Sequence, residues 1–253
     1  MKRKILLYLA VLLLLAGTGV LLYPTIEQWF YERNVMSQKE QFLQNVQIVD
    51  DTGSATGDTP LTEEELIRNQ KMDDLYAWMK SENKRLYETG QSGLVDAFSY
   101  QQPAIDLSKY GIDDDIVGYL SIPSINMELP IYLGANTENM AKGAVHLTET
   151  SYPIGGDNTN CVIAAHRGTS LVMFRNIDKI QLGDLITITN FRETLTYKAV
   201  EIRIILPTDI DQILIQPGRD LVTLITCNPL GANYQRYALY CERWETETDS
   251  GMN

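Results

Sequence analysis

The sequence contains two histidines, His146 and His166, and both are candidates for a catalytic role. Histidine is the side chain whose ordinary pKa lies closest to neutral pH, so these two are the first candidates for proton transfer. His166 follows the apolar segment 161–165 and precedes Arg167-Gly168, which predicts a position at the rim of a sheet. His146 lies between two apolar residues, and we interpret it as a packed, structural histidine.

Cys227 is the candidate nucleophile. It ends the apolar segment Leu221–Thr226, and Arg236 follows nine residues later at the start of another such segment. If the two segments pair as antiparallel strands, Arg236 returns to the side of Cys227. A thiolate attacks an acyl carbon, an imidazole exchanges protons with the leaving and incoming amines, and a guanidinium stabilises the oxyanion. Cys227, His166 and Arg236 therefore predict acyl transfer, and the alternative for Cys227 is a buried structural thiol.

The other two cysteines, Cys161 and Cys241, each lie in a strand-like segment. Outside the cytoplasm, an odd cysteine count flags a free thiol beside any disulfide. A Cys161–Cys241 bridge and two separate, small apolar side chains therefore both stay open.

The elements that must hold these residues are short strands. From Ile116 onward, β-type segments alternate with clusters of Gly, Pro, Asn and Asp, which predicts a closed β-barrel or a sandwich, mostly antiparallel. Brief helices are expected near 137–141 and 171–177, within a catalytic domain at 104–246 that precedes a polar tail at 247–253. The predicted strands are Ile116–Ile122, Glu128–Leu133, Asn160–His166, Leu185–Asn190, Leu195–Leu206, Leu221–Thr226 and Tyr237–Trp244.

Residues 1–26 predict a membrane anchor. Three basic residues at 2–4 precede the uncharged run Ile5–Ile26, and about 20 apolar residues suffice to cross a bilayer. Basic residues stay on the cytoplasmic side, so the chain after Glu27 is expected outside the cell membrane, in a single-pass protein. The alternative is a cleaved signal peptide, but the apolar run continues beyond the small residues at 16–19.

Residues 27–103 predict a helical stalk. The first part, 27–46, is polar but compatible with a helix, and 50–59 has the composition of a loop. Thr62 followed by Glu65 has the spacing of a capping box, so a second helix is expected from there until glycines close it.

Composition and charge argue against several functions. The net charge of −12 argues against a nucleic-acid partner, because phosphates would be repelled. Few histidines, no paired-cysteine spacing and no Gly-rich phosphate loop predict no metal site and no other cofactor. The acidic triplet Asp113–Asp115 is expected to be a solvated face, with a calcium ion as the alternative.

Thr223-Leu224-Ile225-Thr226-Cys227 resembles the Thr-Leu-x-Thr-Cys signature of the sortases, and the spacing from Cys227 to Arg236 resembles that family's. Further segments that resemble the family, in the same order along the chain, are 118–123, 129–132, 143–146 and 165–168. The resemblance implies a mainly β fold, a closed eight-stranded sortase-type β-barrel with short helices. It also implies that His166, Cys227 and Arg236 are catalytic and that Thr226 and Ala165 bind substrate.

Within the sortases the pattern is most similar to class C, the pilin-polymerising enzymes of Gram-positive bacteria. The similarity lies in 118–123, 227–233 and the N-terminal helical extension. It implies cleavage of a Leu-Pro-x-Thr-Gly-like sorting signal between Thr and Gly, a thioacyl-enzyme on Cys227, and transfer to a lysine amine of a pilin subunit. Two alternatives stay open: a housekeeping or accessory sortase that attaches surface proteins to a cell-wall precursor amine, and a non-catalytic, membrane-tethered β-barrel binding module.

Three features depart from the class C pattern. Asp96-Ala97-Phe98 stands where the family carries an Asp-Pro-aromatic lid, and losing the proline frees the backbone, so a weak or absent lid is expected. No C-terminal membrane helix is expected, because the sequence reaches Asn253 without a second apolar run. Tyr234-Gln235 replaces the usual Thr-His before the arginine, which is expected to alter the groove rather than the chemistry.

Overall fold

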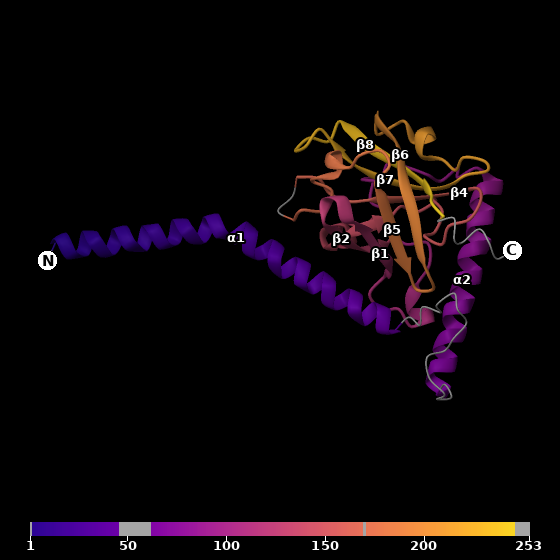
Figure 1. Cartoon of the computed structure of the whole chain (residues 1–253), viewed down its shortest axis with the longest axis horizontal. Coiled ribbons are helices and arrows are strands. Elements are labelled where there is room, and N and C mark those ends of the chain that lie inside the picture. The colour runs from indigo at the N-terminus through magenta and orange to yellow at the C-terminus, as the bar shows by residue number, and fades with distance from the viewer. Residues whose placement is uncertain (1, 46–61, 169–170, 246–253) are drawn as a thin grey trace.

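A computed structural model describes residues 2–45, 62–168 and 171–245 and shows a β-barrel at the end of a long N-terminal helix (Figure 1). The loop predicted at 50–59 and the tail at 247–253 lie outside the described residues. The strands are β1 (Ile116–Ile122), β2 (Met127–Leu133), β3 (Ala144–His146), β4 (Thr159–Ala164), β5 (Leu185–Asn190), β6 (Thr194–Ile205), β7 (Asp220–Asn228) and β8 (Gln235–Arg243). The short helices are η1 (Leu107–Tyr110), η2 (Pro123–Ile125), α3 (Thr137–Lys142), η3 (Ile177–Lys179) and η4 (Ile210–Ile213).

The barrel closes in the order β1-β2-β3-β4-β7-β8-β6-β5, and β5 pairs with β1. The closed eight-stranded barrel is therefore confirmed. Most neighbours are antiparallel, but β2–β3 and β4–β7 are parallel. The strand β3 was not predicted, because three residues are too few to show an alternating pattern. The helix expected at 171–177 is reduced to the single 3-10 turn of η3.

The strands are covered on both faces, which explains their nearly continuous apolar sequences. In β4, the consecutive residues Val162 and Ile163 are both fully buried but belong to different apolar clusters, since successive side chains point to opposite faces. Ile163 shares its cluster with Leu120 and Leu224, and Val162 shares its cluster with Tyr240. Packing on both faces gives the strand ends a rigid base.

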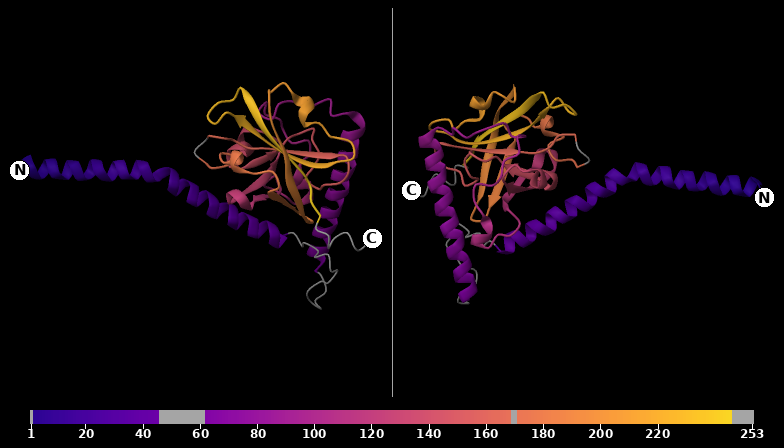
Figure 2. Two further views of the ribbon diagram at one scale, coloured as in Figure 1. Left: turned by 45° about the horizontal axis from the view of Figure 1, so that its top comes forward. Right: turned by 180° about the vertical axis from the view of Figure 1, so that it is seen from behind.

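The helix predicted after Thr62 is α2 (Glu63–Thr89), which lies along the outside of the barrel (Figure 2). The capping box forms, because the Glu65 N–H donates to the Thr62 hydroxyl and the Thr62 N–H donates to the Glu65 carboxylate. Gly90 ends the helix with a φ of 75°, a left-handed conformation that glycine adopts without strain. Leu75 is fully buried against the barrel, which contributes about 1.5–3 kcal/mol.

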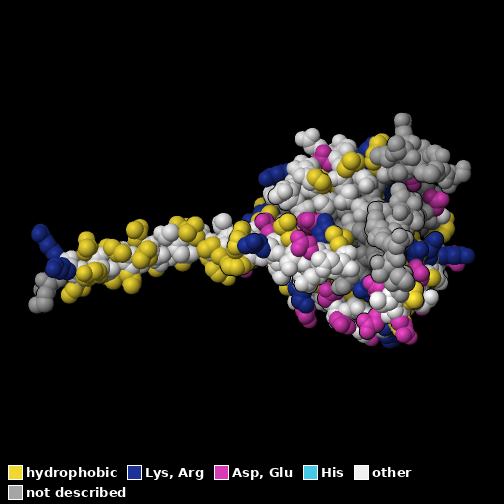
Figure 3. Space-filling view, turned by 60° about the horizontal axis from the view of Figure 1, so that its bottom comes forward, with side chains coloured by type: hydrophobic (Ala, Val, Ile, Leu, Met, Phe, Trp, Pro, Cys, Tyr) yellow, Lys and Arg dark blue, Asp and Glu magenta, His cyan; other side chains and the backbone are white. Residues whose placement is uncertain are grey.

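The helix α1 (Lys2–Asn45) is continuous, but its two halves have different surroundings. The large apolar side chains of the first half are exposed, as Figure 3 shows for one side. Among the described residues, α1 is the one helix long and apolar enough to cross a membrane.

The second half of α1 rests on the barrel and is not a free stalk. Val35 is 2% exposed, the Tyr31 hydroxyl donates to the Lys142 carbonyl, and Phe42 packs edge-on against Tyr119 with ring centroids 5.3 Å apart. Polar contacts extend the same face, since Val172 N–H donates to the Gln28 side chain and Lys39 pairs with Glu128. The contacting residues of α1, at 28, 31, 35, 39 and 42, recur every three or four positions, which is one face of a helix.

Candidate active site

The parallel pair β4–β7 brings His166 and Cys227 to the same end of the barrel. Ala164 lies opposite Ile225, and the pairing continues past β4 because the Ala165 N–H donates to the Ile225 carbonyl. His166 and Cys227 each lie two residues beyond the Ala164–Ile225 pair, so both follow the same end of this parallel pair. An antiparallel pairing of these strands would have placed the two residues at opposite ends.

Arg236 reaches Cys227 from the other side. The strands β7 and β8 are antiparallel, and Cys227 pairs with Arg236 in the register, which confirms the predicted adjacency. Arg236 Nη1 lies 3.9 Å from the Cys227 Sγ and donates to the carbonyls of Asn233 at 2.7 Å and Gln235 at 3.0 Å. These carbonyl contacts hold the guanidinium beside the thiol.

The resemblance assigns Thr226 and Ala165 to substrate binding, but the structure buries both. Each is 0% exposed, and the Thr226 hydroxyl donates to the Ala165 carbonyl at 2.6 Å. Neither side chain is accessible to a substrate in this conformation. The pair instead ties together the two strand ends that carry His166 and Cys227.

Residues 91–103, here called the lid segment, cross the site. Asp96 forms two hydrogen bonds with Arg236, Nε to Oδ1 at 2.8 Å and Nη2 to Oδ2 at 2.7 Å. The Phe98 ring centroid lies 5.8 Å from that of His166 and 4.9 Å from the guanidinium carbon of Arg236. The segment therefore contacts both Arg236 and His166, although Ala97 was expected to leave it weak or absent. Ala97 is fully buried. Packing around Ala97 therefore restrains the backbone of the lid segment, as the ring of a proline would do at this position.

The electrostatics of this arrangement favour an uncharged thiol and an uncharged imidazole. Burial raises the pKa of the Cys227 thiol; the Arg236 cation opposes this shift and the Asp96 carboxylate adds to it. Burial also lowers the pKa of the His166 imidazole. Burial alone would lower the pKa of Arg236, but its hydrogen bonds and charge pairing with Asp96 raise that pKa overall. With the lid segment in place, the Arg236 guanidinium is paired with Asp96, and the Cys227 thiol stays protonated.

A small, mostly apolar pocket lies beside Arg236, between the end of β6 and η4. Its free volume beside Asp96 is about 10 Å³, which is about the room of one water molecule. Apart from Asp96 and Arg236, its main lining residues are Ile205, Leu206, Pro207, Ile210, Ile213 and Ile225. Sequence analysis did not assign these residues to the site, and the only available signal was the concentration of isoleucine around Pro207.

The two remaining cysteines do not bridge. Cys161 and Cys241 both pair with Val222, from opposite sides of β7. Neighbouring strands lie about 4.8 Å apart, so the two Cα atoms are separated by roughly twice that distance, beyond the about 7 Å that a disulfide tolerates. Both are buried, free thiols, and Cys227 is the only cysteine of the three that is partly exposed.

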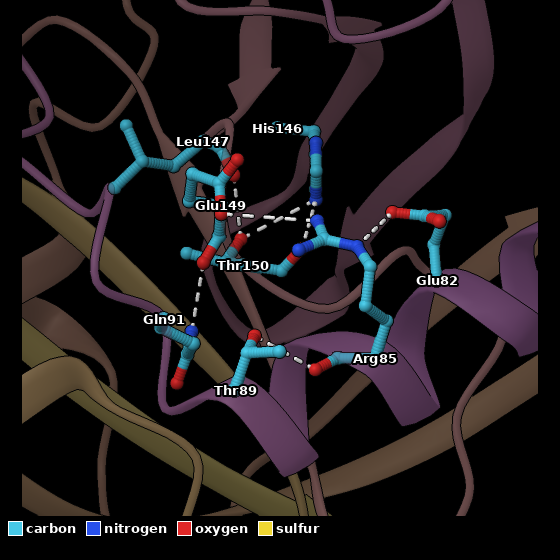
Figure 4. A network of polar contacts seen from close by, with 8 residues as sticks. All are labelled: Glu82, Arg85, Thr89, Gln91, His146, Leu147, Glu149 and Thr150. Atoms are coloured by element: carbon cyan, nitrogen blue, oxygen red, sulfur yellow. Dashed lines mark hydrogen bonds and ion pairs between the residues drawn. The ribbon is translucent and has the colours of Figure 1, made fainter.

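His146 is structural, as interpreted from the sequence. It is 2% exposed, its Nε2 lies 3.0 Å from the Ser151 carbonyl, and its ring stacks on Tyr152 with centroids 4.9 Å apart. Burial lowers the pKa of His146 to about 4, so the ring is neutral at pH 7. Figure 4 shows this ring near the end of α2, where the Gln91 amide donates to the Glu149 carbonyl and fixes the start of the lid segment.

Comparisons with known proteins point to one family. A family model described as the sortase domain matches residues 120–244. Among curated proteins, Sortase D of Bacillus subtilis is 32% identical over 129 residues, which cover 50% of this chain and 63% of that relative, less than two thirds of its length.

Two solved structures are similar over more of the chain. One, described as a pilus-related sortase C of Group B Streptococcus, is 32% identical, with a TM-score of 0.62 over 74% of this chain and 93% of that one. The other, sortase C-1 from Actinomyces oris, is also 32% identical, with a TM-score of 0.55 over 66% of this chain and 99% of that one. The chain therefore belongs to the sortase family of cysteine transpeptidases, and its structural neighbours place it in class C.

Proposed function

We propose that this chain is a membrane-anchored cysteine transpeptidase with Cys227 as nucleophile, His166 as proton carrier and Arg236 as oxyanion donor. The observation that carries the proposal is the placement of one partly exposed thiol between these two partners. Arg236 pairs directly with Cys227 across β7–β8, and the parallel pairing of β4 with β7 brings His166 to the same end of the barrel.

The reaction follows from the roles of these side chains. Once the lid segment is displaced, the Cys227 thiol passes its proton to His166, and the thiolate attacks the threonine carbonyl carbon of a sorting signal while Arg236 stabilises the oxyanion that forms. His166 protonates the amine of the departing glycine as the C–N bond breaks, which leaves a thioester on Cys227. A lysine amine then attacks the thioester, His166 accepts its proton, and the thiolate leaves as the new amide forms. No cofactor enters either step.

The substrate we propose is a Leu-Pro-x-Thr-Gly-like sorting signal. The support within the structure is the apolar lining beside Arg236, whose isoleucine, leucine and proline side chains suit contact with a Leu-Pro pair once Asp96, which also lines this space, is displaced. The acceptor we propose is a pilin lysine, because solved neighbours of this chain are described as pilus-related sortases. The competing acceptor is an amine of a cell-wall precursor.

The lid segment fits this proposal as a cover for the resting enzyme. Asp96 occupies the guanidinium that the oxyanion needs, and Phe98 lies over the imidazole. A sorting signal must displace both side chains before the thiol can react. The rate of cleavage should then depend on how often the segment opens.

The first half of α1 supports anchoring in a cell membrane. Its apolar side chains are exposed, and its only basic residues near the start are those at 2–4. We propose that it spans the bilayer with the barrel on the outer side.

Mass spectrometry of Cys227 tests the enzymatic proposal. The full chain in detergent, with and without Phe98→Ala, is incubated with Leu-Pro-x-Thr-Gly-type peptides and then quenched with acid. We expect the N-terminal peptide fragment as a thioester on Cys227, its absence in Cys227→Ala, and its retention in Cys161→Ala. If the Phe98→Ala chain forms no adduct with any peptide of the set, the chain is not this enzyme and the binding-module alternative is favoured. Adding a pilin lysine peptide or a wall-precursor amine to the adduct then identifies the acceptor.

A further inference from the structure

Arg167 receives no role from sequence analysis, yet its side chain is only 5% exposed and lies directly after His166. Its Nη2 forms an ion pair with Asp178 of η3 at 3.1 Å, and its Nη1 donates to the Asn228 side-chain oxygen at 3.2 Å. The Asn228 amide donates in turn to the Gln235 side-chain oxygen at 3.3 Å. These four side chains form one continuous polar chain that joins the β4–β5 connection to the adjacent ends of β7 and β8.

Three of the four members of this chain are sequence neighbours of the three proposed catalytic residues. Arg167 follows His166, Asn228 follows Cys227, and Gln235 precedes Arg236. Asn228 and Gln235 are also the register pair next to Cys227 and Arg236. Successive residues of a strand point to opposite faces, so the polar chain couples the same three backbone positions without occupying the reaction space.

We propose that Arg167 is a positioning residue that fixes His166 relative to Cys227 through Asn228. This inference rests on the proposed transpeptidase function of the same site. The turn after β4 needs such a link, because the β4 strand ends at Ala164 and His166 lies beyond it. The His166 carbonyl accepts from the Phe174 N–H at 3.0 Å, and the polar chain adds a link to β7 beyond the Thr226–Ala165 hydrogen bond.

Burial restricts the positions that the Arg167 guanidinium can adopt. A buried cation is costly unless it is paired and hydrogen-bonded, so its position is restricted to where Asp178 and Asn228 can both be reached. The guanidinium carbon also lies 5.6 Å from the Tyr237 ring centroid, and Nε has no hydrogen-bond partner among the described residues. Lysine carries one donor group on a flexible stem and would satisfy only one of the two partners at a time.

Close contact between the turns reinforces the same alignment. Gly168 has a φ of +100°, and a Cβ at this position would lie 3.3 Å from the Gly231 backbone nitrogen in the β7–β8 connection. A side chain there would strain the backbone and push the two turns apart. Gly168 therefore lets Arg167 approach Asn228 at hydrogen-bond distance.

The test measures acylation separately from thiol reactivity in full-length Arg167→Met, made with and without Phe98→Ala so that lid opening does not limit the rate. Single-turnover acylation by a sorting peptide needs His166 and Cys227 in alignment, whereas iodoacetamide at high pH needs only the thiolate. We expect maximal acylation to fall by roughly 10²-fold, as for a displaced catalytic group. Half-saturating peptide concentration and alkylation at high pH should stay unchanged. Arg192→Met, which removes an exposed arginine paired with Asp73, is the matched control and should leave both rates unchanged.

Two further variants separate positioning from general instability. Asn228→Ala should reproduce the loss, and Arg167→Met/Asn228→Ala should be no slower than either single variant, because both remove one link. Arg167→Lys should recover part of the acylation rate. If Arg167→Met does not fold, Asn228→Ala and Arg167→Lys carry the same measurement.

Unchanged acylation in a folded Arg167→Met or Asn228→Ala overturns the inference, as does an equal loss of alkylation, or a double variant whose loss is the sum of the two. Failure of the proposed function would look different, since the unsubstituted chain would then form no thioester at all.

Discussion

Replacing Asp96 with asparagine keeps the shape of the side chain but removes the charge that holds the lid segment on Arg236. The two carboxylate oxygens accept hydrogen bonds of 2.8 and 2.7 Å, and the Asp96 and Arg236 side chains are only 16% and 6% exposed. A hydrogen bond to a charged group contributes about 1.5–3 kcal/mol net. Losing about that much from the closed state should raise the open population roughly 10- to 150-fold. Arg236 should stay in place, because its Nη1 also donates to the Asn233 and Gln235 carbonyls.

The rate of Cys227 alkylation by iodoacetamide reports this population. The other two thiols are buried and their pKa values are raised by burial, so labelling is confined to the site. At a fixed pH, Asp96→Asn should react roughly 10- to 150-fold faster than the unsubstituted chain. Its pH profile should also move to lower pH, because the Asp96 charge and the burial of the thiol both raise the pKa of Cys227. Phe98→Ala should shift the profile in the same direction by relieving burial alone.

Asp73→Asn is the control, since it removes the same charge from an exposed ion pair on α2. If Asp96→Asn and Asp73→Asn are alkylated at the same rate as the unsubstituted chain, the lid segment does not control access to the thiol. Deleting residues 91–103 should strongly raise the rate of peptide cleavage. If the rate does not rise, the lid is weak or absent, as expected from Ala97.

Three further predictions concern the surrounding structure. The folded-state pKa of His146 is about 4, below its ordinary value of 6.5. Between these two pH values, His146 is therefore protonated in the unfolded chain but not in the folded one. The free energy of unfolding should therefore be highest above pH 6.5 and fall by up to about 3 kcal/mol towards pH 4; chemical denaturation across this range should show a flatter profile in His146→Phe. Thr62→Ala removes the hydroxyl that caps α2 and should lower the free energy of unfolding by about 1 kcal/mol, whereas Thr89→Ala at the other end of the helix serves as a comparison that should cost less. Phe42→Ala removes the edge-on contact with Tyr119 and should weaken the docking of α1 by about 1 kcal/mol, seen as faster amide exchange in residues 33–42 with no change around Leu75.

The strands of the barrel could be predicted well because their apolar segments are bounded by turn residues. Seven of the eight begin and end within two residues of the predicted bounds, for example β1 at Ile116–Ile122 and β5 at Leu185–Asn190. Two failures have a common cause. The strand β3 is three residues long, and η3 is a single turn, so neither spans enough positions to show a period. The docked face of α1 was missed because two of its contacts use Gln28 and Lys39, which an apolar pattern does not reveal.

The sequence by itself determined which groups could react. Two histidines, one thiol at the end of an apolar segment, and an arginine nine residues later left few other assignments, and a hairpin between adjacent segments already implied the Cys227–Arg236 pair.

Only the tertiary structure decided the rest. Whether His166 joins that pair depends on β4 lying parallel to β7, across 61 residues of chain, and strand direction leaves no trace in composition. The same holds for Asp96, which is 140 residues from Arg236, and for Arg167, whose partners come from η3 and β7. Contacts between distant segments depend on how the barrel closes, and local patterns carry no information about closure.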